Sequence, residues 1–206
     1  MQLKVYRSGS AEAALVVGHG AGAGQGSPFM VRTAEGLASR GISTATFDFP
    51  YMAAKRSVPD RAPVLEQAWR DAIDRARQEF AELPLFIGGK SMGGRISSQV
   101  ASQGVEGVSG LIFLGYPLHP PGKAEQRRDA HLPAISQPML FVQGTRDPFG
   151  TADEIRELLP RLQRATLHEI AGGDHSFKVS GKGAPKPDAV LGGILDEVKR
   201  WVGEHR

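Results

Sequence analysis

A serine between two glycines has the surroundings of a nucleophile. The motif is Gly-Lys-Ser-Met-Gly, with Ser91 at its centre and Gly89 and Gly93 two residues away on either side. A predicted strand over 84–89 precedes the serine, and a predicted helix over 92–103 follows it. Strand, sharp turn and helix form a nucleophile elbow, which needs small residues where the strand and the helix nearly touch. The alternative interpretation is an ordinary glycine-rich turn.

Two later segments supply an acid and a base, so that the chain order is serine, acid, histidine. Asp147 follows a predicted buried strand over 138–143, and His175 follows another over 166–170. Both therefore lie beyond the carboxyl ends of strands, where open α/β sheets build their sites. A serine hydroxyl is a poor nucleophile until a base takes its proton, and histidine suits that role near neutral pH. A carboxylate then fixes the tautomer of the ring. We predict a catalytic triad of Ser91, Asp147 and His175.

Other carboxylates could replace Asp147 in this scheme. Asp174 is the main rival, but a side chain directly next to His175 in sequence is poorly placed to orient that ring. Asp48 and Asp153 are weaker candidates.

Acyl transfer also requires donors for an oxyanion. A predicted buried strand over 13–18 is followed by His19 and the small residues Gly-Ala-Gly. We assign the oxyanion hole to the backbone N–H groups of Met92, just after the nucleophile, and Ala21. Gly22 is the less favoured alternative donor. His19 is expected to have a structural role.

Six segments spread over nearly the whole chain carry a resemblance to a known family: residues 19–22, 47–51, 88–95, 115–123, 143–150 and 172–177. They resemble the α/β-hydrolase superfamily, and within it the dienelactone-hydrolase-like group. The resemblance does not supply a substrate. True dienelactone hydrolases use a cysteine nucleophile and this chain has no cysteine, and the group also includes proteins better known for interactions than for catalysis.

The alternation of apolar strands with helices predicts an α/β fold. We expect the α/β-hydrolase fold, with a mostly parallel central sheet and helices on both faces, in a single domain over residues 1–206. Residues 116–137 leave room for a short helix near 123–131 but not for a cap domain, so the site should be open. Expected strands are 2–7, 13–18, 43–49, 84–89, 109–115, 138–143 and 166–170. Other expected helices are 28–40, 61–81, 92–103, 152–163 and 188–203.

Composition narrows the function classes. A chain that is 40% hydrophobic and 23% charged is ordinary for a globular protein. Its net charge of +3 is too small and dispersed to indicate nucleic-acid binding. The first seven residues lack the apolar core of a signal peptide, and no apolar run is long enough to cross a membrane. We expect a cytoplasmic protein without membrane or nucleic-acid partners; the sequence does not indicate its oligomeric state.

Two segments resemble the sequence motifs of nucleotide-binding sites. Gly89-Lys90-Ser91 resembles the end of a P-loop, but Pro84 stands where the first glycine belongs. Residues 18–23 match a G-x-G-x-x-A dinucleotide fingerprint, but Pro28 and other residues separate them from the next helix. That oxidoreductase alternative leaves the elbow, the acid and the base unexplained. We expect no cofactor and no metal, since the histidines lack metal-ligand spacing.

The sequence therefore predicts a serine hydrolase that cleaves an ester, thioester or amide of a small molecule. The alternative from another class is a non-catalytic scaffold for protein binding. Basic residues near the predicted site could make its substrate anionic; alternatively, they point to solvent. These residues are Lys90, Lys123, Arg127, Arg128, Arg146, Lys178 and Lys182. We assign substrate contacts to Gly20, Gly22, Lys90, Tyr51 and Tyr116.

Overall fold

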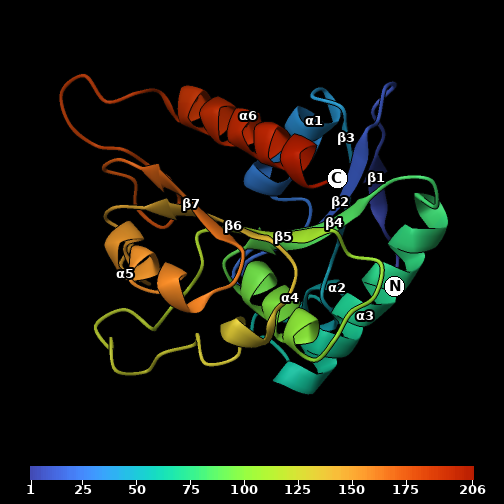
Figure 1. Ribbon diagram of the computed structural model, residues 1–206, viewed down its shortest axis with the longest axis horizontal. Helices are drawn as coiled ribbons and strands as arrows, with labels where there is room; N and C mark the ends of the chain where they lie inside the picture. Colours follow the sequence, from blue (N-terminus) through green and yellow to red (C-terminus); the bar gives the residue numbers. More distant parts are fainter.

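The computed structural model describes residues 1–206, and its centre is a seven-stranded sheet with helices on both faces (Figure 1). The strand order is β1-β3-β2-β4-β5-β6-β7. Only β1 runs antiparallel to its neighbour, so the predicted mostly parallel sheet is confirmed. The strands are β1 Lys4–Tyr6, β2 Ala13–Gly18, β3 Ile42–Phe47, β4 Leu85–Lys90, β5 Gly110–Leu114, β6 Met139–Gly144 and β7 Ala165–Ile170.

The helices form one layer on each side of this sheet. Helices α1 and α6 cover one face, while α3, α4 and α5 lie on the other (Figure 1). Strands covered on both faces are buried along their whole length, and every residue of β2, β3 and β6 is buried. No helix is both long enough and apolar enough to cross a membrane. The helices are α1 Pro28–Ala38, α2 Pro50–Ala53, α3 Ala62–Glu79, α4 Met92–Ser102, α5 Ala152–Arg156 and α6 Pro187–His205.

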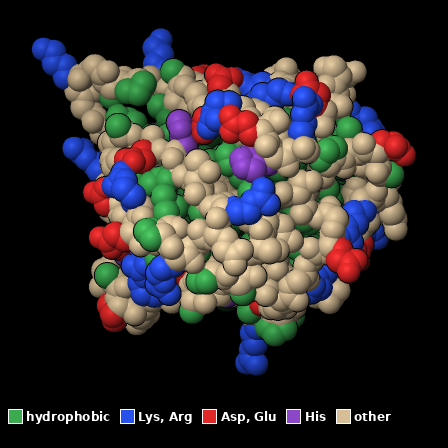
Figure 2. Space-filling model, viewed as in Figure 1, with side chains coloured by type: hydrophobic (Ala, Val, Ile, Leu, Met, Phe, Trp, Pro, Cys, Tyr) green, Lys and Arg blue, Asp and Glu red, His purple; other side chains and the backbone are tan.

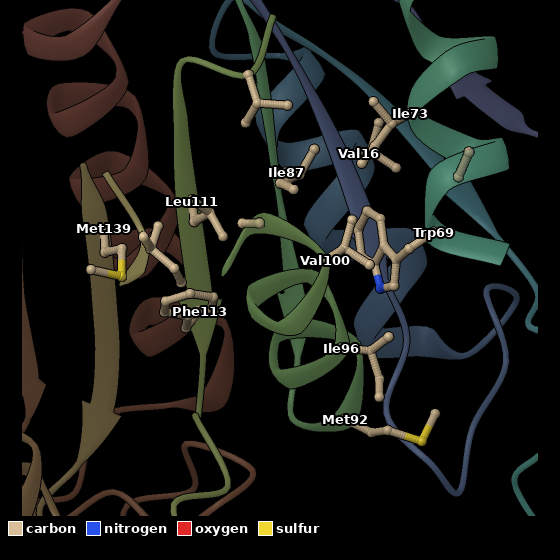
Figure 3. Close-up of a cluster of buried hydrophobic side chains, with 14 of the residues drawn as sticks. Val16, Trp69, Ile73, Ile87, Met92, Ile96, Val100, Leu111, Phe113 and Met139 are labelled. Atoms are coloured by element: carbon tan, nitrogen blue, oxygen red, sulfur yellow. The ribbon is translucent and has the colours of Figure 1, made fainter. Parts of the chain in front are cut away.

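The larger hydrophobic cluster joins α3 and α4 to the sheet (Figure 3). Helix α3 buries residues spaced three and four apart, from Leu65 through Trp69 to Ala76, as expected of a helix with one apolar face. Trp69 packs edge-on against Phe47 and donates its indole N–H to the carbonyl of Gly93 at 3.1 Å. This contact fixes the start of α4, and hence the residue before it, against the core.

Two helix predictions were wrong. Residues 123–131 form turns rather than a helix, and only a 3₁₀ turn at Leu132–Ala134 follows. The segment is instead held by single contacts, such as the backbone N–H of Arg128 to the carbonyl of Leu118 at 2.8 Å. Helix α5 ends at Arg156 and gives way to a 3₁₀ turn over Leu159–Arg161, because Pro160 has no N–H to continue an α-helix. The short helix α2 was not foreseen.

The sheet topology places two loops close to one another. The chain runs outward from β2 to β3 and then returns to the other side of β2 with β4. Ligands of open α/β sheets bind at the carboxyl ends of the strands where the winding reverses. At this reversal lie the loop after Gly18 and the turn after Lys90, and no cap domain covers them.

Gly93 illustrates how closely the elbow packs. A Cβ atom at this position would lie 2.2 Å from the carbonyl oxygen of Gly18, which is backbone and cannot turn aside. Gly93→Ala should therefore destabilise the fold by about 3 kcal/mol or more. Urea denaturation measures this loss. Gly26→Ala is the matched control, because its Cβ would meet nothing within 4 Å, and an equal effect of both changes would contradict the prediction.

Candidate active site

Ser91 occupies the sharp turn between β4 and α4. Its backbone has φ 50° and ψ −115°, a conformation that residues other than glycine rarely adopt. The hydroxyl does not cap α4; its Oγ instead lies 2.8 Å from Nε2 of His175. The strained backbone thus directs the hydroxyl to the histidine.

The structure brings the three predicted triad residues into one hydrogen-bonded chain. Nδ1 of His175 lies 2.7 Å from Oδ2 of Asp147, on the opposite side of the ring from Ser91. The Asp147 side chain is fully buried, and that of His175 is 19% exposed. With its proton on Nδ1, the ring donates to the carboxylate and presents a free lone pair at Nε2. It can therefore take a proton from Ser91.

A buried glutamine at the end of β6, which is not among the predicted site residues, holds Asp147 in place. The side-chain amide of Gln143 donates to Oδ2 of Asp147 at 3.1 Å and to the carbonyl of Gly150 at 2.6 Å. Its Oε1 accepts the backbone N–H of Tyr116 at 2.8 Å. A polar residue at the end of an otherwise apolar strand was the available signal, because a buried amide must be hydrogen bonded.

The rival acid Asp174 turns away from the ring. Its Oδ1 accepts the backbone N–H groups of Ser176 at 2.8 Å and Lys178 at 2.9 Å. It therefore shapes the loop that carries His175. The ring of Phe149 packs against the ring of His175, with 4.3 Å between the two ring centroids.

The two proposed oxyanion donors are free in the structure. The backbone N–H groups of Met92 and Ala21 donate no hydrogen bond within the protein, and both residues line the same pocket as Ser91. The N–H of Gly22 is also unbonded, so the alternative donor stays open. These N–H groups can donate to an oxygen that becomes negative beside the serine.

Two aromatic side chains orient the loop that carries these donors. Nδ1 of His19 lies 2.7 Å from the carbonyl oxygen of Gly20, and the hydroxyl of Tyr51 donates to the carbonyl of Ala21 at 2.8 Å. Because the carbonyl and N–H of a trans peptide point in opposite directions, these bonds turn the N–H groups of Ala21 and Gly22 the other way. Burial lowers the pKa of His19, which favours the neutral ring.

A pocket of about 590 Å³ opens above the serine. Gly20, Gly22 and Lys90, three of the expected substrate contacts, line it. The other two do not. Tyr51 is buried beneath the Ala21 carbonyl, and Tyr116 is buried with its hydroxyl donating to the carbonyl of Arg128 at 2.8 Å. Both assignments to substrate were wrong, because each hydroxyl already has a backbone partner that it holds in place.

Lys90 supports the histidine loop. Its ammonium group lies 2.5 Å from the carbonyl oxygen of His175 and 5.2 Å from the ring centroid of Phe177. Burial lowers the pKa of Lys90 to about 8, and Asp147 and Asp174 offset part of that effect. The side chain is therefore directed at the protein as well as bordering the pocket.

This lowered pKa predicts a pH-dependent stability. Below about pH 8, Lys90 is charged in both states and the folded state bears the cost of burying the charge. Between about pH 8 and 10.5, the unfolded chain binds more protons, so the free energy of unfolding rises with pH. Lys90→Met should remove this rise, as measured by urea denaturation at pH 7.5, 9 and 10.5. The exposed Lys123 is the control, and Lys123→Met should follow the wild type. An identical pH dependence in Lys90→Met and wild type would contradict the prediction.

The structure contains no group of three or more His, Asp or Glu side chains arranged to hold a metal ion.

The loop with the dinucleotide-like glycines passes beside the serine. A Cβ atom added to Gly20 would lie 3.7 Å from Cβ of Ser91. Helix α1 begins only at Pro28, so these glycines do not lead directly into its N-terminus.

Fold and site together define an α/β hydrolase. The sequence model of the alpha/beta hydrolase domain family matches residues 11–203, and the chain belongs to that family.

Solved structures share the fold at low sequence identity. Est1E from Butyrivibrio proteoclasticus with ferulic acid bound superposes with a TM-score of 0.77 at 14% identity, covering 99% of this chain and 94% of that one. Dienelactone hydrolase from Anabaena variabilis gives a TM-score of 0.77 at 20% identity, with coverage of 98% and 91%. An uncharacterised Agrobacterium tumefaciens protein described as a putative alpha/beta hydrolase gives 0.75 at 17% identity, with coverage of 98% and 91%. The likeness covers nearly all of each chain.

Proposed function

We propose that this protein is a serine hydrolase that cleaves an ester, thioester or amide of a small molecule through an acyl-enzyme on Ser91. The observation that carries the proposal is the continuous chain from Asp147 through His175 to Ser91, with distances of 2.7 and 2.8 Å, beside unbonded N–H groups. Family membership supports it. Each part of that chain has a defined task in acyl transfer.

In the proposed reaction, Ser91 Oγ attacks the substrate carbonyl carbon while Nε2 of His175 takes the hydroxyl proton. The carbonyl oxygen becomes an oxyanion and accepts hydrogen bonds from the N–H groups of Met92 and Ala21. His175 then gives its proton to the leaving group, and the acyl group stays on Ser91. A water molecule, deprotonated by His175, then attacks the acyl carbon. The bond from that carbon to Ser91 Oγ breaks, the acid is released, and His175 returns its proton to Ser91. Asp147 stabilises the imidazolium that forms in both halves.

Pocket size and charge support a small-molecule substrate. A volume of about 590 Å³ is typical of small-ligand sites. Positive and negative side chains are interspersed on the face shown in Figure 2, without the single-sign field that a nucleic-acid surface would require. We also propose that the protein acts in the cytoplasm.

A panel of p-nitrophenyl esters with acyl chains of two to eight carbons, run beside acyl-CoA thioesters, tests the activity. We expect turnover of at least one series, above the rate of the Ser91→Ala variant. A folded protein that turns over neither series faster than this variant would contradict the proposal.

A further inference from the structure

The pocket has a basic end that the proposed mechanism does not use. Arg95 and Arg128 line the same pocket as Ser91 and His175. Arg95 lies one helical turn beyond the serine, and its backbone N–H donates to the Ser91 carbonyl at 3.0 Å. Residues four apart share a helix face, and helical side chains tilt toward the N-terminus. The Arg95 side chain therefore leans toward the nucleophile.

Arg128 reaches the pocket from a different segment of the chain. Its backbone is held on both sides, by the N–H bond to Leu118 at 2.8 Å and by the Tyr116 hydroxyl on its carbonyl at 2.8 Å. The neighbouring Arg127 is engaged elsewhere, with its guanidinium 3.1 Å from Asp129. Of these two adjacent arginines, Arg128 alone lines the pocket.

Both pocket arginines lack an acidic partner. Neither forms an ion pair, although most arginines of this chain do. The guanidinium of Arg95 has one side-chain hydrogen bond, to the neutral Gln99 at 3.3 Å, and that of Arg128 has none. A half-buried guanidinium has five N–H donors to satisfy, so two of them facing one pocket leave many donors for a ligand.

The surrounding charges do not neutralise this end. Burial, followed by repulsion from Arg128, lowers the pKa of Arg95; Tyr116 and Glu66 oppose these effects. Glu66 is engaged by the amide of Gln103 at 2.9 Å. The acid in the pocket lining is Asp60, whose carboxylate pairs with Arg56 at 2.7 Å. The guanidinium groups of Arg95 and Arg128 therefore repel each other in the pocket, and an anion bound between them would relieve this repulsion.

We propose that Arg95 and Arg128 bind a carboxylate of the substrate, so that the preferred substrates are small esters carrying one negative charge. The inference rests on the proposed hydrolase function and specifies its substrate class. Guanidinium groups suit a carboxylate because their planar N–H pairs match its two oxygens. The sequence had already suggested a basic site that included Arg128 together with other basic residues, but not Arg95. Of those, Lys90 is directed at His175, and Lys123, Arg127, Arg146, Lys178 and Lys182 do not line the pocket.

The test compares two esters of equal shape. 4-Acetoxybenzoate carries a carboxylate on its leaving group, and 4-acetoxybenzamide is its neutral counterpart; each kcat/KM is corrected for the alkaline hydrolysis rate of the ester. We expect the wild type to prefer the carboxylate by about tenfold to a hundredfold. Arg95→Gln and Arg128→Gln should each bring this ratio toward one. Arg127→Gln, in which the adjacent arginine is changed, should keep the wild-type ratio.

The outcomes separate the subsite from the activity. The wild type could hydrolyse the ester bond of 4-acetoxybenzamide through Ser91 as efficiently as that of 4-acetoxybenzoate. The proposed carboxylate subsite would then be wrong, while the proposed hydrolase function would stand. An unchanged preference in both glutamine variants, shown to be folded by circular dichroism, would also overturn the subsite. A preference over the neutral ester that is seen for 4-acetoxyphenyl phosphate but not for 4-acetoxybenzoate would also overturn the proposal, because the site would then bind phosphate rather than a carboxylate. Failure to hydrolyse either ester above the rate of Ser91→Ala would count against the proposed function itself.

Discussion

Ser91→Ala is expected to lower kcat by about five to six orders of magnitude, because it removes the atom that forms the acyl-enzyme. The residual rate would come from oxyanion stabilisation and binding. The measurement is the steady-state hydrolysis of the best ester found for the wild type.

The fold should survive this change. The Ser91 hydroxyl caps no helix, and its only side-chain partner is Nε2 of His175, which lines the open pocket. Circular dichroism and the urea midpoint should match the wild type. A kcat within tenfold of the wild type would remove Ser91 from the mechanism.

Asp147→Asn should lower kcat by about four orders of magnitude. The buried asparagine would accept the backbone N–H of Phe149 at Oδ1, as Asp147 does at 2.8 Å. Its amide nitrogen would then face the ring of His175 and donate to Nδ1. That favours the tautomer with its proton on Nε2, which cannot take a proton from Ser91.

Asp174→Asn is the matched control for Asp147→Asn, since both acids lie near His175. Asp174 accepts only the loop N–H groups of Ser176 and Lys178, and an asparagine oxygen can accept the same bonds. We expect kcat to change by less than about tenfold. The opposite ranking, with Asp174→Asn crippling and Asp147→Asn mild, would contradict the assignment of the acid.

The fold was largely predictable because its signals are local. Parallel strands buried on both faces appear as short apolar runs, and the predicted positions of all seven strands agree with the structure to within a few residues. The elbow was predictable for a similar reason. Gly89 and Gly93 are required where a Cβ would strike the backbone of Gly18, so the spacing of residue types reports a steric need.

Features that depend on long-range partners were not predictable. Tyr51 and Tyr116 lie in motif segments near the site, and nothing local shows that their hydroxyls bond backbone carbonyls of other segments. Arg95 resembled an ordinary helix residue until the fold placed Arg128 in the same pocket. The error over 123–131 has the same cause, since contacts from Leu118 and Tyr116 decide that segment's course.

Labelling with a fluorophosphonate, followed by mass spectrometry of the digested protein, tests the central claim most directly. The probe reacts with an activated serine regardless of which ester the enzyme prefers. We expect a single modified peptide with the label on Ser91, no labelling of Ser91→Ala, and labelling slowed by orders of magnitude in His175→Ala and Asp147→Asn. A folded wild type that stays unlabelled, or is labelled at another serine, would contradict the account and favour a binding role for this fold.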